Sequence, residues 1–292
     1  MTMKRSAWIP ETRTGRRGFL AAAAAMAAHG AVAGEQPATA APGTRKPPAK
    51  RPFQLGLASY TLRKFSLEQT LAMTRRVDLK YLCLKSFHLP LDAKPEEIAA
   101  AAAKVKAAGI VLYGCGVVSM NQPAEVDQAF NYAKTAGMKT IVAAPKPELL
   151  PLVEQRVREY DLQVAIHNHG PGDKVYPTPQ SIYEKVRELD KRIGICIDIG
   201  HTLRIGADPI ESTRKYAERI LDVHIKDVSA ASAKGQTVEV GRGVIDIPAF
   251  LRALVEIQYR GVVSFEHEKD ENDPLAGLAE SVGYVRGVLA VI

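Results

Sequence analysis

Four short apolar segments of this 292-residue chain each end in a side chain that can bind a metal ion. The four residues are His167, Asp198, His224 and Glu266. Two imidazoles and two carboxylates form a mixed nitrogen and oxygen set, which suits Mn²⁺, Zn²⁺, Co²⁺ or Fe²⁺ better than Mg²⁺, an ion that prefers oxygen ligands and water. Each residue alone could be an ordinary polar group at a strand end. Together they predict one divalent metal site.

Other polar residues lie at or near the ends of predicted strands. His169 and His201 are close in sequence to two of the predicted ligands, so they could orient those ligands, contact a substrate or belong to a second ligand set. The remaining candidates are Tyr60, Lys85, His88, Lys146 and Lys226. A solvated lysine or a packed tyrosine is the ordinary alternative, but we expect one or two of the lysines to bind substrate oxygens.

These candidates need a fold that gathers the strand ends. From residue 53 onward, apolar segments alternate eight times with helical patterns. The predicted strands are residues 55–60, 81–87, 110–118, 140–144, 163–167, 194–198, 221–226 and 261–266. Helix starts are marked by the Ser66 and Gln69 capping box, by Pro95 and by Asp208-Pro209-x-Glu211.

Eight strand–helix pairs in about 240 residues predict an α/β fold of the (β/α)8 TIM barrel type, which typically takes about 250 residues. A doubly wound sheet is the alternative, but no GxGxxG follows the first strand and no Walker motif occurs. In a barrel, active sites lie at the carboxyl ends of the strands, which is where the candidate residues fall. Gly241-Arg242-Gly243 is either a phosphate-binding nest or a flexible loop.

The net charge of +7 does not indicate a nucleic-acid partner. Residues 1–50 contain eight Lys and Arg and only two acidic residues, so most of the excess lies there and the remaining chain is almost neutral. The three cysteines, Cys83, Cys115 and Cys196, fall in separate apolar segments. We therefore interpret them as small core residues rather than as disulfide partners or a metal knuckle.

Residues 1–33 are predicted to be a signal peptide of the twin-arginine type. Arg16-Arg17 precedes Phe19-Leu20 and a short apolar stretch, and Ala31-Val32-Ala33 has the form of a cleavage site. A basic disordered terminus is the alternative. Because the apolar stretch is too short to span a bilayer, we expect no stable membrane anchor. The prediction is export to the periplasm or another extracytoplasmic space, with residues 34–52 a disordered Pro/Ala-rich spacer and 53–292 the barrel.

Several segments, in this order and spacing, carry a family resemblance. They are Ala165-Ile166-His167-Asn168-His169, Asp198-Ile199-Gly200-His201, His224-Ile225-Lys226-Asp227, Gly241-Arg242-Gly243-Val244-Ile245-Asp246 and Phe265-Glu266. Together they resemble the xylose isomerase-like barrels, often called sugar phosphate isomerase/epimerase, which include hydroxypyruvate isomerases, ketose 3-epimerases and inosose dehydratases. The resemblance covers nearly all of residues 53–292.

The resemblance implies that Asp198, His224 and Glu266 bind one divalent metal and that His201 contacts the substrate. The chain departs from the family at the first ligand, where His167 replaces a glutamate. Imidazole still coordinates metals, but the two glutamates that exchange a proton across the sugar are no longer both present. The related apurinic-site endonucleases need an Asp-x-His after the seventh strand, which is missing here.

These observations predict a divalent-metal-dependent sugar isomerase or epimerase that transfers a proton next to a carbonyl through an enediolate. Glu266 is the predicted base, and the predicted acid or oxyanion partner is His201, Lys85 or Lys146. Substrate binding is assigned to Tyr60, His88, His169 and Lys226.

Two alternatives remain. One is a metal-dependent lyase or dehydratase that eliminates a group from a keto-sugar or a 3-keto-glycoside. The other is a non-catalytic periplasmic sugar-binding protein. The predicted partner is a small sugar or keto-sugar, without nucleic acid, and a homo-oligomer is compatible with the sequence.

Overall fold

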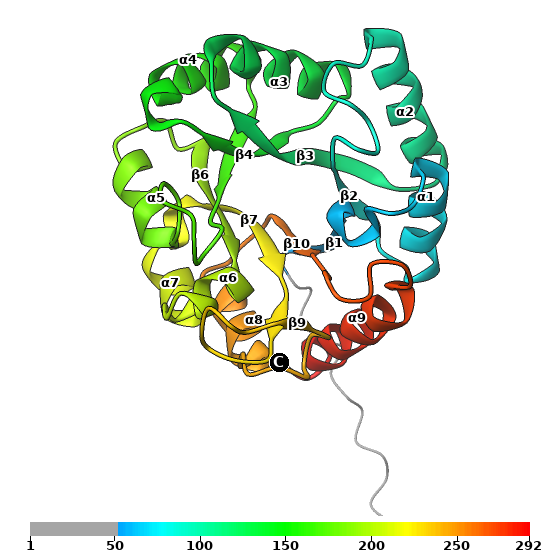
Figure 1. Ribbon diagram of the computed structural model, residues 1–292, viewed down its shortest axis with the longest axis vertical. Helices are drawn as coiled ribbons and strands as arrows, with labels where there is room; N and C mark the ends of the chain where they lie inside the picture. The colour runs from blue at the N-terminus through cyan, green and yellow to red at the C-terminus, as the bar shows by residue number, and fades with distance from the viewer. Residues whose placement is uncertain (1–51) are drawn as a thin grey trace, which may run out of the picture. The chain divides into compact units, whose positions relative to one another are not determined.

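Eight apolar segments form the parallel strands of a closed barrel in the computed structural model, which describes residues 52–292 (Figure 1). The strands are β1 (Gln54–Ala58), β2 (Tyr81–Leu84), β3 (Val111–Met120), β4 (Thr140–Pro145), β5 (Gln163–His167), β6 (Ile193–Asp198), β7 (Ile220–Ile225) and β10 (Val262–Phe265). They follow one another around the barrel in the order β1-β10-β7-β6-β5-β4-β3-β2. The predicted (β/α)8 fold is therefore confirmed, because a doubly wound sheet would leave two open edges.

The predicted signal peptide of residues 1–33 lies outside the described residues. So does the predicted spacer, except for its last residue. Both remain predictions.

Helices surround the barrel (Figure 1). They are α1 (Leu67–Arg76), α2 (Pro95–Ala107), α3 (Pro123–Thr135), α4 (Leu150–Tyr160), α5 (Pro179–Val186), α7 (Pro209–Lys215), α8 (Ile247–Glu256) and α9 (Leu275–Leu289). Two of the predicted helix-start signals form capping hydrogen bonds in the structure. Ser66 and Gln69 form a reciprocal capping box, and the Asp208 carboxylate accepts hydrogen bonds from the backbone N–H groups of Ile210 and Glu211.

Three short segments differ from the prediction. The first strand ends at Ala58, because Ser59–Leu62 form a 3₁₀ turn, η1. A six-residue helix, α6 (Ile199–Arg204), follows β6 directly. After β7, β8 (Asp227–Val228) and β9 (Thr237–Val238) pair as a small antiparallel ribbon. Sequence periodicity does not reveal such segments, since each is shorter than two helical turns or a typical strand.

Apolar side chains pack in two places. The larger cluster fills the space between the barrel and its helices. A smaller one lies apart from it and contains Cys83, Tyr113, Val142, Ala165, Cys196 and Val262, which come from six different strands. All three cysteines are buried free thiols, as predicted.

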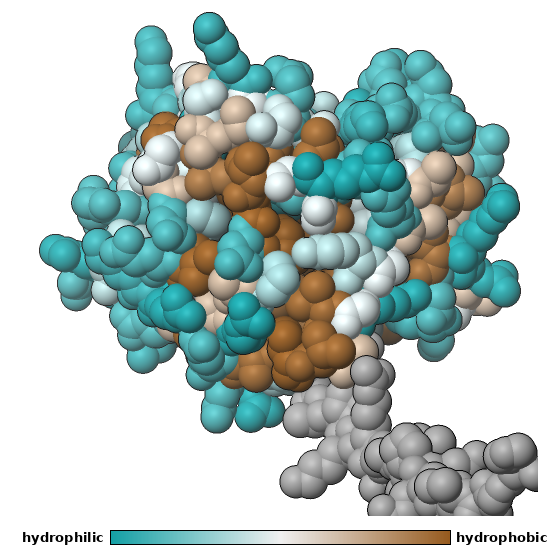
Figure 2. Space-filling model, turned by 90° about the horizontal axis from the view of Figure 1, so that it is seen from below, coloured by the Kyte–Doolittle hydropathy of each residue, from teal (hydrophilic) through white to brown (hydrophobic). Residues whose placement is uncertain are grey.

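The outer surface carries a mixture of hydrophilic and apolar side chains. On the side shown in Figure 2, apolar residues gather at the middle of the face and hydrophilic ones surround them. Exposed apolar side chains include Val255 on α8 and Tyr284 on α9. Within residues 52–292 no helix is both long enough and apolar enough to cross a bilayer. The homo-oligomer remains a prediction.

Candidate metal centre

The four predicted metal ligands come from four strands that are consecutive around the barrel. His167 ends β5, Asp198 ends β6, His224 lies near the end of β7, and Glu266 follows β10. In the parallel register Asp198 pairs with His224, and His224 pairs with Ser264, two residues before Glu266. Side chains two apart on a strand point to the same face. His167 likewise pairs with Cys196, two residues before Asp198. The register therefore brings all four ligands to the same rim, each within two residues of its neighbour's level.

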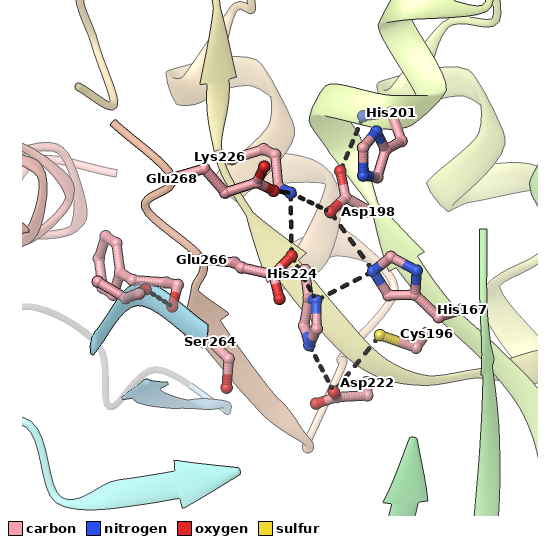
Figure 3. A network of polar contacts seen from close by, with 12 residues as sticks. His167, Cys196, Asp198, His201, Asp222, His224, Lys226, Ser264, Glu266 and Glu268 are labelled. Atoms are coloured by element: carbon pink, nitrogen blue, oxygen red, sulfur yellow. Dashed lines mark hydrogen bonds and ion pairs between the residues drawn. The ribbon is translucent and has the colours of Figure 1, made fainter. Parts of the chain in front are cut away.

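The potential ligand atoms of these residues converge (Figure 3). His167 Nε2 lies 3.1 Å from His224 Nδ1 and 3.5 Å from Asp198 Oδ2. His224 Nδ1 lies 3.3 Å from Glu266 Oε2. All four atoms lie within 4.8 Å of one another, and all four side chains are buried. Two ring nitrogens and two carboxylate oxygens turned toward one point are the donor set of a divalent transition-metal ion.

The electrostatics of His167, Asp198 and Glu266 agree with this fit. Burial lowers the pKa of His167 well below its usual value, so its ring is neutral and carries a lone pair. Burial alone would raise the pKa of Asp198 and of Glu266. The nearby Lys226 ammonium outweighs this effect and holds both carboxyl groups ionised, with pKa values well below the usual range. Neutral imidazoles and ionised carboxylates are the protonation states that bind metals. His224 differs from His167, because the carboxylates of Glu266, Asp222 and Asp198 outweigh the effect of burial and raise its pKa. The His224 ring therefore has to give up a proton when it binds a metal ion.

Lys226 lies behind this cluster. Its ammonium is 2.9 Å from Asp198 Oδ2, 2.9 Å from Glu266 Oε2 and in contact with Glu268. The side chain is only 1% exposed. Burial opposes its charge, but the three carboxylates raise its pKa well above the usual value. Lys226 therefore balances the negative charge of the ligand carboxylates.

A cavity of about 270 Å³ is lined by two of the four converging residues, His167 and Glu266. The other lining residues are Tyr60, Lys85, Val117, His169, His201 and Glu268. Four of the predicted catalytic or substrate-binding residues, Tyr60, Lys85, His169 and His201, therefore face the same space as Glu266. The cavity is large enough for a small polar molecule such as a sugar.

Three predicted residues do not line this cavity. His88 is held by the side chains of Ser59 and Thr70 at 2.9 and 3.0 Å, so its ring nitrogens are engaged. Lys146 precedes the short turn η2 (Pro147–Leu149). Lys226 is the buried ammonium described above. Their predicted roles toward a substrate have no contact in support.

Sequence reasoning missed two acidic residues of the site. Glu268 lines the cavity, and Asp222 lies fully buried beneath His224. Asp222 could have been found, because it is a carboxylate two residues before a predicted ligand within an apolar strand. Burial raises its pKa to about 6. Glu268 lies in a polar stretch with several other acids, so nothing in the sequence distinguishes it.

Neither reading of Gly241-Arg242-Gly243 is correct. The Asp227 carboxylate accepts hydrogen bonds from the backbone N–H groups of Gly241, Gly243 and Ile245 at 3.0, 2.9 and 3.2 Å. These donors are therefore not free to bind a phosphate, and the loop is held in place. A Cβ atom on Gly243 would lie 2.1 Å from Asp227 Oδ1, which explains the glycine at that position.

Comparisons with known proteins agree with the fold. A family model described as xylose isomerase-like TIM barrel matches residues 47–288. Inosose dehydratase from Geobacillus kaustophilus is 29% identical over 129 residues, which are 39% of this chain and 41% of that protein. The first two curated relatives are matched over only about 40% of their own length.

Two solved structures share the architecture. The IolI protein with a bound zinc atom superposes with a TM-score of 0.64 and 20% identity, covering 81% of this chain and 98% of that one. The 3-keto-D-glucoside 4-epimerase of E. coli gives a TM-score of 0.66 and 16% identity, covering 80% and 99%. At these identities the likeness concerns the fold. The family model spans most of the sequence, and the chain belongs to the xylose isomerase-like TIM barrel family.

Proposed function

We propose that this protein is a divalent-metal-dependent enzyme that moves a proton next to the carbonyl group of a sugar or keto-sugar. The observation that carries the proposal is the convergence of His167, Asp198, His224 and Glu266 beside a cavity lined by polar side chains. The curated relatives include inosose dehydratases, whose name denotes an enzyme that acts on a keto-sugar-like compound.

The four converging residues would hold the ion. A divalent cation supplies a Lewis acid, which polarises a carbonyl oxygen and makes the neighbouring C–H bond more acidic. Glu266 is the proposed base, because it lines the cavity and is ionised. Its carboxylate is fixed by the Lys226 ammonium at 2.9 Å, so it does not need to reorganise before it accepts a proton.

Lys85 and His201 are the proposed partners of the oxygen that gains negative charge. The Lys85 ammonium lies 5.1 Å from the centroid of the Tyr60 ring, and within residues 52–292 it has no carboxylate within 4.0 Å. Its backbone N–H donates to Ser59 Oγ at 2.8 Å, which fixes its position at the end of β2. His201 is placed by α6, and its Nδ1 lies 3.4 Å from Nη1 of Arg204.

If the proton returns to the sugar, the reaction is an isomerisation or epimerisation. If a substituent leaves instead, the same proton removal gives an elimination, and two observations favour this second candidate. His167 takes the place of one of the two glutamates that the family uses as bases, and an elimination needs only one base at the carbon. Several curated relatives are inosose dehydratases.

The test combines metal analysis with isotope exchange. Purified protein is loaded with Mn²⁺, Zn²⁺ or Co²⁺ and incubated with 3-keto-glucosides in D₂O. Deuterium in the recovered sugar indicates isomerisation or epimerisation, and release of the aglycone indicates elimination. Glu266→Gln should abolish both. The matched control is Glu271→Gln, since Glu271 pairs with Arg63 and Lys64 and does not line this cavity.

Two results would contradict the proposal. Protein that takes up no stoichiometric divalent metal would remove the metal site. Full turnover by Glu266→Gln would remove the base. A metal-loaded protein that binds sugars and catalyses neither exchange nor release would instead support the sugar-binding alternative.

A further inference from the structure

Asp222 is a carboxylate deep inside the barrel that has no lysine or arginine partner. It is fully buried on β7, two residues before His224 and on the same face of the strand. No Lys or Arg of residues 52–292 lies within 4.0 Å of it. A buried carboxylate without a compensating charge is costly, so its surroundings must supply protons or a cation.

The neighbours of Asp222 supply protons. The Tyr113 hydroxyl donates to Asp222 Oδ1 at 3.1 Å, and the Cys196 thiol donates to Oδ2 at 3.5 Å. Ser264 Oγ lies 2.6 Å from the Tyr113 oxygen. A tyrosine has a single hydroxyl proton, which Tyr113 gives to Asp222, so Ser264 must be the donor in that pair. Every hydrogen bond in the group is thus directed toward Asp222.

Tyr113 reaches this group from the far side of the barrel. β3, which carries Tyr113, is four strands away from β7 in a ring of eight. Cys196 comes from β6, where it pairs in register with Asp222. The carboxylate is therefore held by donors from two strands, and Ser264 on β10 holds the Tyr113 hydroxyl in turn.

The remaining neighbour of Asp222 is His224. Its Nε2 lies 3.7 Å from Asp222 Oδ2 and has no hydrogen-bond partner within the described residues, so the carboxylate is the polar group that this nitrogen faces (Figure 3). The opposite ring nitrogen, Nδ1, lies 3.1 Å from His167 Nε2 and 3.3 Å from Glu266 Oε2. The ring thus stands between a buried carboxylate on one side and the metal ligands on the other.

We propose that Asp222 is a positioning residue, which keeps the proton of His224 on Nε2 and leaves the Nδ1 lone pair for the metal ion. The inference rests on the metal site of the proposed function. A carboxylate favours a proton on the nitrogen that faces it, and the proton of a neutral imidazole can occupy only one nitrogen. A carboxylate behind a metal-binding imidazole also increases the basicity of the coordinating nitrogen.

The first test reads the tautomer of His224 directly. Protein with ¹⁵N-labelled histidine is treated with EDTA, and long-range ¹H–¹⁵N correlation spectra assign the protonated nitrogen. The spectra are recorded at a pH at which the His224 ring is neutral, where we expect Nε2–H in the unsubstituted protein and a mixture of both tautomers in Asp222→Asn. An unchanged Nε2–H tautomer in the variant would overturn the proposal.

The second test measures Zn²⁺ affinity by competition with a chromophoric chelator. Asp222→Asn should weaken binding by about 10- to 100-fold. Tyr113→Phe, which keeps the carboxylate and removes one donor, should weaken it less. The matched control is Thr213→Val on α7, because Thr213 is also fully buried and its hydroxyl bonds only the Pro209 carbonyl, away from the site.

The outcomes separate this inference from the proposed function. If the unsubstituted protein binds no metal, the proposed function fails, while the tautomer measurement still decides the role of Asp222. If it binds metal and Asp222→Asn binds within twofold of it, the positioning role is wrong. Should Asp222→Asn fail to fold, Tyr113→Phe takes its place, and a Zn²⁺ affinity equal to that of the Thr213→Val control would refute the inference.

Discussion

The two oxygens of Asp198 have different partners, and this allows their contributions to be measured separately. Oδ1 accepts a hydrogen bond from the His201 N–H at 2.8 Å and thereby caps α6. Oδ2 lies 3.5 Å from His167 Nε2, among the predicted metal ligands. We predict that Asp198→Asn keeps the cap and loses the anionic ligand, whereas Asp198→Ala loses both.

The magnitudes follow from these contacts. Replacing a helix N-cap Asp or Asn by Ala costs about 1 kcal/mol. For a domain of this size, 1 kcal/mol corresponds to roughly 2–4 °C in Tm. In EDTA, Asp198→Ala should therefore melt about 2–4 °C below Asp198→Asn. An ion present at 100 times its Kd stabilises the folded state by about 2.7 kcal/mol, and both variants should lose most of that gain.

The assay is thermal unfolding of the three proteins in EDTA and in excess Zn²⁺ or Mn²⁺. The control is the pair Asp208→Asn and Asp208→Ala, since Asp208 caps α7 in the same way and lies outside the metal cluster. Its Asn and Ala variants should differ by a similar amount and keep the full response to metal. The reasoning is refuted if Asp198→Asn gains as much stability from metal as the unsubstituted protein. Equal Tm values for the two Asp198 variants in EDTA would also refute it.

Two further predictions concern stability. Arg219 is buried and donates hydrogen bonds to four backbone carbonyls, those of Arg187, Leu189, Asp190 and Ile193. Arg219→Met should therefore lower the free energy of unfolding, measured by urea titration, by about 3–5 kcal/mol, and Arg219→Lys should lower it less. Equal urea midpoints for the Arg219→Met variant and the unsubstituted protein would contradict this. Asp190 is hydrogen-bonded by Arg192, which lowers its pKa below the usual range, so its stabilising effect is complete above the usual aspartate pKa of about 3.9 and is lost as the pH falls below it. Asp190→Asn should therefore melt below the unsubstituted protein at pH 7, with a gap that narrows toward pH 2, and a gap that stays constant with pH would exclude the ion pair as its cause.

Much of the fold can be predicted because its signals are local. Apolar periodicity predicts the strands and helices, and single residues such as Ser66, Pro95 and Asp208 predict where helices begin. Short segments escape prediction for the same reason. α6 is too short to show a period, and its only signal is Asp198, a residue that the sequence also marks as a metal ligand.

The sequence by itself determined which side chains could do chemistry. The positions at strand ends do not depend on the order of the strands in the sheet, and they are occupied by His167, Asp198, His224 and Glu266. Only the tertiary structure decided that β5, β6, β7 and β10 are consecutive around the barrel, which brings the four ligands within 4.8 Å of one another. The tertiary structure also places Lys226 among the carboxylates and Asp222 next to the His224 ring. In addition, the backbone N–H groups of Gly241 and Gly243 donate hydrogen bonds to Asp227. The physical reason is that strand order, register and barrel closure join residues far apart in the chain, and no local pattern records those contacts.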